Sequence, residues 1–286
     1  MIYEAERCSR TFKTKYDNKY CNRCLRKSDA DKHFAEVPFD NLLGYNTIKK
    51  KGISTMEFTK YGITETPKLI YNNPLASESD IEGFVLEGTA NISFPEGKLR
   101  MENGLSAAQG QKANYVLWCP KNFPSNVYIE WEFQPLKEPG LAILFFAAKG
   151  RNGEDLFDES LQPRTGEYPL YHHGDINAFH VSYFRRKEPD ERSFHTCNLR
   201  KSYGFYLVAQ GADPIPDVAD VSAPYKLGLL KYENQVRFFV NDLEVFNFND
   251  DGTTYGPCLE GGKIGFRQLA PMIGEYSKLK VYSFEN

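Results

Sequence analysis

The chain has 286 residues, enough for one large domain with a small addition or for two domains. Its net charge of −3 gives no reason to expect nucleic-acid binding along the whole chain, and no apolar run approaches the roughly 20 residues of a membrane span. Aromatic residues make up 14% of the chain, and 22 Gly with 16 Pro favour a β-rich globular protein with many turns.

Residues 1–60 differ from the rest in charge and in cysteine spacing. They carry 13 Lys/Arg against 8 Asp/Glu, a net of +5, which leaves −8 for residues 61–286. Cys8, Cys21 and Cys24 follow a C-x12-C-x2-C spacing, with His33 nearby. Zinc takes about four Cys or His ligands, so these residues are a candidate zinc site. The alternative is a basic extension with three free thiols, and Met56 could be a second start.

The sequence around the other cysteines predicts a location in the cytoplasm. Cys119, Cys197 and Cys258 are isolated in apolar or strand-like sequence, as buried free thiols are. The opening "MIYEAERCSR" has no apolar core of a secretory signal. A nucleic-acid partner would rest on residues 1–60 alone, and we do not expect one.

From about residue 68 the sequence indicates one short strand after another. "VYIEWEFQ" (127–134) alternates apolar and polar residues, as a half-buried strand does. "LAILFFAA" (141–148) is apolar throughout and indicates a central strand. "QVRFFVNDLEVFNF" (235–248) indicates a hairpin that turns at Asn241-Asp242. Further strands are predicted at 69–72, 83–87, 90–94, 98–103, 113–118, 177–186, 194–199, 204–208, 225–232, 261–268 and 278–285.

These strands, without a long amphipathic helix, predict an all-β fold. We expect residues 61–286 to form a two-sheet antiparallel sandwich of jelly-roll type, preceded by a small Cys-containing extension.

The stretch "YHHGDINAFHVSYFRRK" (171–187) concentrates polar and titratable groups. A regular strand at 177–186 would place alternate residues on opposite faces. One face would hold Asn177, Phe179, Val181, Tyr183 and Arg185, and the other Ala178, His180, Ser182, Phe184 and Arg186. Because small residues flank His180, we predict that it forms the floor of a groove with space for a ligand above it.

The same region carries the groups that bind sugars. In sugar-binding sites, aromatic rings pack against the apolar C–H patches of the sugar, and amide, carboxylate and guanidinium groups bind its hydroxyls. Arg can also hold the carboxylate of a uronic acid. The predicted substrate-binding residues are Tyr171, Asp175, Asn177, Arg185, Arg186, Asn198, Arg200 and Lys201. The predicted catalytic residues are His180, Tyr183 and His172, of which His180 is preferred as a general acid or base. Alternatively, these groups only satisfy backbone atoms and solvent.

Two sets of carboxylates offer other chemistry. Glu130 and Glu132 share a strand face about 6.5–7 Å apart, within the range used in glycoside hydrolysis, but they also fit a solvated face. Glu154, Asp155 and Asp158 lie on an acidic loop and could supply oxygen ligands to calcium.

Several segments resemble the YesU family, a family of unknown function with a concanavalin A-like sandwich. They include "PGLAILFFAAKGRNGEDLFD", "GDINAFHVSYFRRK", "TCNLRKS" and "GGKIGFRQLAPM", nearly collinear over about residues 68–286. The resemblance implies a jelly-roll fold, a cytoplasmic role and a link to rhamnogalacturonan use. Its motif maps onto His172, Gly174, Asp175, Asn177, His180, Ser182, Tyr183, Arg185, Arg186, Asn198, Arg200 and Lys201, but does not require His173 or His195. The carboxylate motif of sandwich β-glucanases is absent, which weakens the hydrolase interpretation of Glu130 and Glu132.

We therefore predict a cytoplasmic carbohydrate-active protein that acts on short oligosaccharides of pectin or rhamnogalacturonan type. If it is an enzyme, it would be a glycoside hydrolase or a polysaccharide lyase. The alternative is a non-catalytic, lectin-like binding or sensing protein. The sequence leaves the oligomeric state open.

Overall fold

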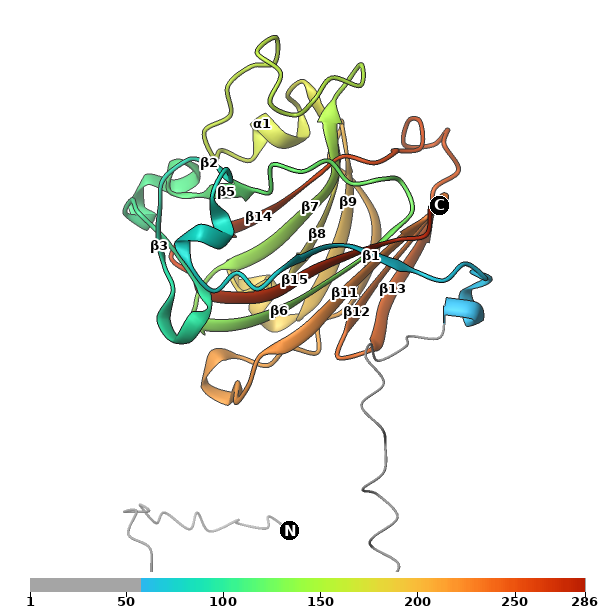
Figure 1. Cartoon of the computed structure of the whole chain (residues 1–286). Coiled ribbons are helices and arrows are strands. Elements are labelled where there is room, and N and C mark those ends of the chain that lie inside the picture. Colours follow the sequence, from blue (N-terminus) through green and yellow to red (C-terminus); the bar gives the residue numbers. More distant parts are fainter. Residues whose placement is uncertain (1–57, 286) are drawn as a thin grey trace, which may run out of the picture. The chain divides into compact units, whose positions relative to one another are not determined.

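The computed structural model describes residues 58–285, and there two antiparallel sheets pack face to face (Figure 1). The eight-stranded sheet has the order β13-β12-β11-β6-β15-β4-β3, with β1 paired to β15. The seven-stranded sheet has the order β10-β9-β8-β7-β14-β5-β2. The predicted all-β, two-sheet antiparallel sandwich is confirmed.

The strands lie close to their predicted positions. They are β1 (Lys68–Asn73), β2 (Val85–Glu87), β3 (Ala90–Ser93), β4 (Leu99–Asn103), β5 (Tyr115–Trp118), β6 (Val127–Lys137), β7 (Leu141–Gly150), β8 (Ile176–Tyr183), β9 (Thr196–Ser202), β10 (Tyr206–Ala212), β11 (Tyr225–Tyr232), β12 (Gln235–Val240), β13 (Leu243–Asn249), β14 (Lys263–Leu269) and β15 (Ile273–Ser283). The helices are short: α1 (Pro169–His172), α2 (Pro189–Ser193) and the 3-10 turns η2 (Phe58–Tyr61), η3 (Glu78–Ile81), η4 (Pro95–Gly97), η5 (Ala107–Ala113) and η6 (Val218–Asp220).

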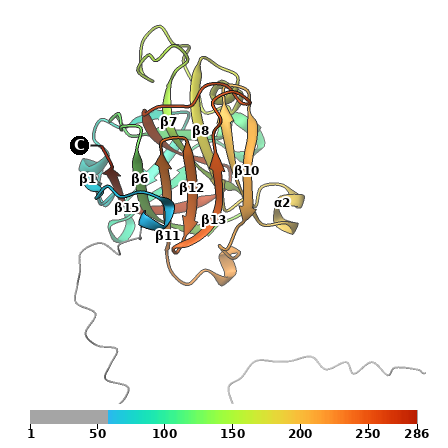
Figure 2. The same cartoon turned by 90° about the vertical axis from the view of Figure 1, so that its right-hand side faces the viewer.

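The alternating pattern of the strands accounts for the core between the sheets. In β6 the residues Ile129, Trp131 and Phe133 all face this core, and their polar neighbours face outward. The β12–β13 hairpin turns at Asn241 and Asp242, whose φ values of 47° and 66° match the turn type that joins twisted strands. Figure 2 shows β10 and β13, the edge strands of the two sheets, side by side.

The outer face of the seven-stranded sheet is partly covered as well. The chain between β7 and β8 folds over this face and includes α1, which lies above the sheet in Figure 1. A second apolar cluster forms beneath it, in which Trp118, Phe145 and Tyr171 are fully buried. This cover explains why β7 is apolar on both faces, as its sequence predicts.

One strand prediction was too long at its C-terminal end. Strand β8 ends at Tyr183, because Phe184 takes the left-handed backbone conformation with φ 46°. Phe184 consequently packs in the core between the sheets beside Tyr183. The predicted face shared by His180, Phe184 and Arg186 is therefore wrong beyond residue 183.

The structure bears on the predicted absence of a membrane span but does not reach the predicted zinc ligands or the second start. No helix within residues 58–285 is long and apolar enough to cross a membrane. Cys8, Cys21, Cys24, His33 and Met56 lie outside the described residues.

Candidate functional site

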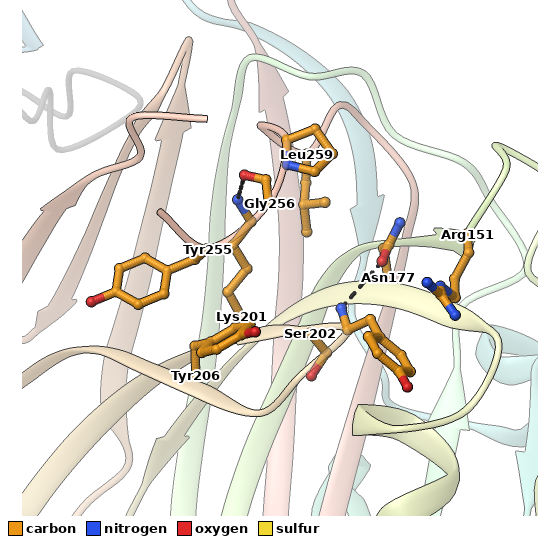
Figure 3. A pocket seen from close by; sticks show the side chains of 10 residues that line it. Arg151, Asn177, Lys201, Ser202, Tyr206, Tyr255, Gly256 and Leu259 are labelled. Atoms are coloured by element: carbon orange, nitrogen blue, oxygen red, sulfur yellow. Dashed lines mark hydrogen bonds between the residues drawn. The ribbon is translucent and has the colours of Figure 1, made fainter. Parts of the chain in front are cut away.

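A cavity of about 290 Å³ opens at one end of the sandwich, where several strands of the seven-stranded sheet begin or end. Arg151 directly follows β7, Asn177 is near the start of β8, and Tyr206 begins β10. The loop between β13 and β14 closes the opposite side with Tyr255 and Leu259. We call this cavity the end groove (Figure 3).

Three tyrosines give the end groove its aromatic walls. Tyr203 and Tyr206 are 41% and 44% exposed, although large aromatic side chains are normally buried. The rings of Tyr206 and Tyr255 lie with their centroids 5.3 Å apart. The Arg151 guanidinium lies over the ring of Tyr203, 4.0 Å from its centroid. Figure 3 shows Tyr206 and Tyr255 on one side of the groove and Arg151 on the other.

Polar donors between these walls remain available to a ligand. The Asn177 side-chain oxygen accepts a hydrogen bond of 3.1 Å from the Tyr203 backbone N–H, which leaves its amide N–H₂ group toward the groove. Arg151 is exposed and makes no ion pair within residues 58–285. The groove thus presents an amide in its middle and a guanidinium on the side opposite Tyr206 and Tyr255.

Lys201 forms part of the floor of the end groove, but its ammonium group is already paired with a carboxylate. Its Nζ donates to Asp250 Oδ2 at 2.7 Å and to the Gly256 carbonyl at 2.9 Å, with both charged side chains buried. This contact ties the β13–β14 loop, and so Tyr255, to the end of β9. Direct substrate binding by the Lys201 ammonium, as predicted, does not fit this geometry; Lys201 is a positioning residue.

Two neighbouring hollows meet the end groove at Arg151. One, of about 530 Å³, is lined by Arg151, Glu154, Ser160 and Asp175. The other, of about 220 Å³, shares Arg151, Asn177 and Leu259 with the end groove. Together they extend the surface available to a ligand longer than one sugar ring. Asp175 lines the larger hollow, and its Oδ2 accepts a 2.6 Å hydrogen bond from the Gln162 backbone N–H.

His180 lies beneath this end of the sheet but is only 1% exposed. Its Nδ1 is 2.7 Å from the Tyr168 hydroxyl and its Nε2 is 2.8 Å from the Ser202 hydroxyl. Its ring stacks between Phe145 and Phe205, with centroids at 5.2 and 6.1 Å. The predicted open space above His180 is therefore filled, because α1 and the β9–β10 turn cover it.

The environment of His180 keeps its imidazole neutral. Burial, with Arg200 and other cationic neighbours adding to it, lowers the pKa of His180 well below its usual value. Burial and the adjacent His173 lower the pKa of His172 to about 4. The His172 ring packs on Phe205 at 4.3 Å between centroids.

Three other predicted site residues are fully buried. Tyr183 lies in the core between the sheets, where its hydroxyl accepts a 3.2 Å hydrogen bond from Trp131 Nε1. Tyr171 is part of α1 and packs into the second apolar cluster, where its hydroxyl accepts a hydrogen bond from the Gly166 backbone N–H. Arg186 is held by Asp213, Asp217 and the Ile215 carbonyl. None of the three can touch a substrate in this arrangement, so these assignments are corrected.

The remaining predicted residues lie together on the outer face of the seven-stranded sheet. Arg200 pairs across strands with His180, and Asn198 pairs with Ser182. Arg185 reaches the same area, where it donates to Thr196 and forms an ion pair of 2.6 Å with Glu191. This area is separated from the end groove by the turn that carries Tyr203 and Phe205.

The carboxylates considered for hydrolysis or calcium binding form ion pairs or hydrogen bonds with neighbouring side chains. Glu130 and Glu132 pair with Lys280 and Lys278 on the outer face of the eight-stranded sheet. In the acidic loop, Asp155 pairs with Lys263 at 2.9 Å. Within residues 58–285, no three His, Cys, Asp or Glu side chains are placed to share a metal ion. In the described residues, Glu154, Asp155 and Asp158 thus do not converge on one metal position.

The residues that sequence reasoning missed are Arg151, Tyr206 and Tyr255. They come from separate turns, and no periodic pattern marks them. A weak signal exists for Tyr255 alone, in the Tyr-Gly pair at 255–256, whose glycine has a φ of 82°. The pair also occurs at 203–204 in the groove and at 61–62 outside it, and no comparable signal marks Arg151 or Tyr206.

A model of the family described as "Domain of unknown function (DUF1961)" matches residues 68–281. The uncharacterized protein YesU of Bacillus subtilis (strain 168) is 52% identical over 213 residues, which is 74% of this chain and 94% of the relative. The chain belongs to the DUF1961 family. The resemblance to YesU seen in the sequence is thereby confirmed.

Solved structures place this DUF1961 member among galectin-like folds. A Bacillus subtilis protein of unknown function with a galectin-like fold superposes with a TM-score of 0.73 at 49% identity, covering 77% of this chain and 97% of that one. The potassium-bound carbohydrate recognition domain of Emp46p superposes with a TM-score of 0.50 at 14% identity, covering 74% and 96%. At that identity the second likeness shows the fold alone.

Proposed function

We propose that the chain binds a short oligosaccharide in the end groove. The observation that carries the proposal is the presence of three tyrosines around two free donors, Arg151 and Asn177, in an open cavity. Sugar rings offer apolar C–H patches to aromatic faces and hydroxyls to amide or guanidinium donors. The volume of about 290 Å³ is near the lower end of small-molecule sites, roughly 300–1,000 Å³, and the adjoining hollows extend it.

Fragments of pectin or rhamnogalacturonan type are the ligand class that we propose, with a cytoplasmic location. Arg151 stacks on Tyr203 but forms no ion pair with residues 58–285, which supports an acidic sugar, because a guanidinium holds a carboxylate through two hydrogen bonds. The free thiols of Cys119 and Cys197, both buried, support a reducing compartment.

Calorimetric titration with pectin-derived oligosaccharides tests this proposal. Tyr206→Ala should weaken binding roughly threefold to tenfold, since one aromatic contact contributes about 0.5–1.5 kcal/mol. Phe194→Ala is the matched control, because Phe194 is an exposed aromatic side chain (74%) on a segment that does not line the groove. Equal binding by both variants and the unaltered chain would contradict the proposal.

A catalytic role is the second candidate, and one contact favours it. The Tyr168 hydroxyl lies 2.7 Å from Nδ1 of His180, within hydrogen-bonding distance, so the neutral imidazole orients that hydroxyl. Tyr168 is partly exposed, so it and not His180 would touch a substrate. Product analysis after long incubation separates the candidates: new products that Tyr168→Phe abolishes mean catalysis, and binding without products means a lectin-like role.

The zinc site at Cys8, Cys21, Cys24 and His33 stays a prediction. Metal analysis of the full chain should find one zinc per chain, and Cys21→Ser should remove it. Absence of stoichiometric zinc at neutral pH would leave residues 1–60 as a basic extension.

A further inference from the structure

A fully buried arginine without an acidic partner lies on the outer face of the seven-stranded sheet. Arg267 donates to the Gly166 carbonyl and to Gln111, and its guanidinium lies 4.7 Å from the Tyr168 ring centroid. Its Nε has no hydrogen-bond partner. Removing a guanidinium from water costs several kcal/mol unless an opposite charge compensates for it. Within residues 58–285, no carboxylate pairs with Arg267.

Two more arginines lie near the same tyrosine. Arg200 and Arg185 both act electrostatically on Tyr168, together with Arg267. Arg200 donates only to the Phe205 carbonyl and lies 3.9 Å above the Phe205 ring centroid, without an ion pair in the described part of the chain. Among residues 58–285, Glu191 is the one carboxylate bound to these three arginines, through Arg185. Three positive charges therefore face a single negative one.

Neutral hydrogen-bonding groups lie beside these charges. Residues Thr196, Asn198 and Arg200 project from the outer face of β9, successive residues about 6.5–7 Å apart. Asn198 is bonded to exposed Gln210 at 2.7 Å, and Ser182 lies across from it on β8. We call the group Tyr168, Arg185, Asn198, Arg200 and Gln210 the outer-face strip. Its ends are accessible, since Arg200 and Tyr168 are partly exposed and Gln210 is exposed.

We infer that the outer-face strip is a second ligand site, which takes a carboxylate flanked by hydroxyl groups, as in a uronic acid. The carboxylate supplies the negative charge that Arg200 and Arg267 lack within the described residues. Exposed Gln210 donates and accepts hydrogen bonds at a neighbouring hydroxyl, and buried Asn198 holds Gln210 in place. Arg200 contacts the ligand, whereas buried Arg267 acts on it through its field. The inference does not depend on saccharide binding in the end groove.

Nitrogen-15 NMR of arginine Nε–Hε signals in the full chain, titrated with galacturonate, tests the inference. The Arg200 signal, identified by its loss in Arg200→Gln, should shift saturably, and galactose should leave it unchanged. Arg200→Gln should weaken galacturonate binding at the strip about tenfold, as followed on the Arg185 signal. Arg192→Gln is the matched control, because Arg192 is exposed and donates only to backbone carbonyls.

Arg151→Gln distinguishes this site from the end groove. The Arg200 shift should persist in that variant even if the variant abolishes saccharide binding in the groove. An unmoved Arg200 signal, or equal shifts with galactose, would overturn the inference and leave the proposed function standing. Loss of the Arg200 shift in Arg151→Gln would also overturn it, because one site would then account for both effects.

Discussion

Arg186 and Arg267 are both fully buried, yet their surroundings are opposite. Arg186 lies between Asp213 and Asp217, at 3.3 and 2.9 Å, so the fold itself compensates its charge. Arg267 lies against the rings of Tyr168 and Tyr171, beside two further arginines, and no carboxylate among residues 58–285 pairs with it. The fold itself compensates Arg186, which sequence analysis assigned to substrate binding and which is a structural arginine. For Arg267 we infer that a carboxylate bound at the outer-face strip offsets the charge.

Replacement of each buried arginine by methionine should give the largest contrast. Arg186→Met leaves Asp213 buried without its cation, so the free energy of unfolding should fall by about 3–5 kcal/mol. Arg267→Met removes no ion pair of residues 58–285 but leaves the buried Gly166 carbonyl without its donor, so the loss should be smaller, about 1–3 kcal/mol. Urea unfolding measures both. Equal losses would break the comparison, because Arg267 would then be compensated within the chain.

The hydrogen bonds of His180 provide the next test. Ser202→Ala leaves His180 Nε2 buried without a partner and should cost about 1–3 kcal/mol of unfolding free energy. Ser182→Ala is the matched control on the same face, since its hydroxyl makes only a long 3.5 Å bond to a carbonyl. If Ser182→Ala lowers the free energy of unfolding as much as Ser202→Ala does, the hydrogen bond to His180 contributes no extra stability.

The pH dependence of stability tests the electrostatic side of the comparison. Burial lowers the pKa of His180 in the folded chain, whereas the unfolded value is about 6.5. The unfolded chain therefore binds a proton that the folded chain does not, and stability should fall as pH decreases below about 6.5. The slope from this group is at most about 1.4 kcal/mol per pH unit.

His180→Gln should accordingly flatten the stability profile between about pH 6.5 and 5, as measured by urea unfolding at each pH. His172, whose pKa is lowered to about 4, would still contribute part of the slope in that variant. An unchanged slope would mean that His180 is not held neutral by the fold.

Much of the fold follows from local sequence patterns, and much of the site does not. The alternation in "VYIEWEFQ" and the Asn241-Asp242 turn were sufficient to place strands and a hairpin, because each signal is contained in neighbouring residues. Strand parity correctly separated Tyr183 from His180, but it could not reveal the left-handed Phe184 that ends the pattern. The cover over His180 was equally hidden, since α1 and the β9–β10 turn reach it only through tertiary contacts.

The residues of the end groove could not be grouped from local sequence patterns either. Arg151, Tyr206 and Tyr255 are far apart in sequence. They line one cavity because the end of β7, the start of β10 and the β13–β14 loop lie at the same end of the sandwich. The buried Lys201–Asp250 pair then holds that loop in place. Their proximity depends on the sheet order, which local patterns do not encode.

The most direct test of the proposed function is a crystal structure of the chain soaked with pectin-derived oligosaccharides. The account predicts sugar density in the end groove, with a ring against Tyr206 or Tyr255 and a polar group at Arg151. Density elsewhere on the molecule with an empty end groove, under conditions where calorimetry shows binding, would contradict it.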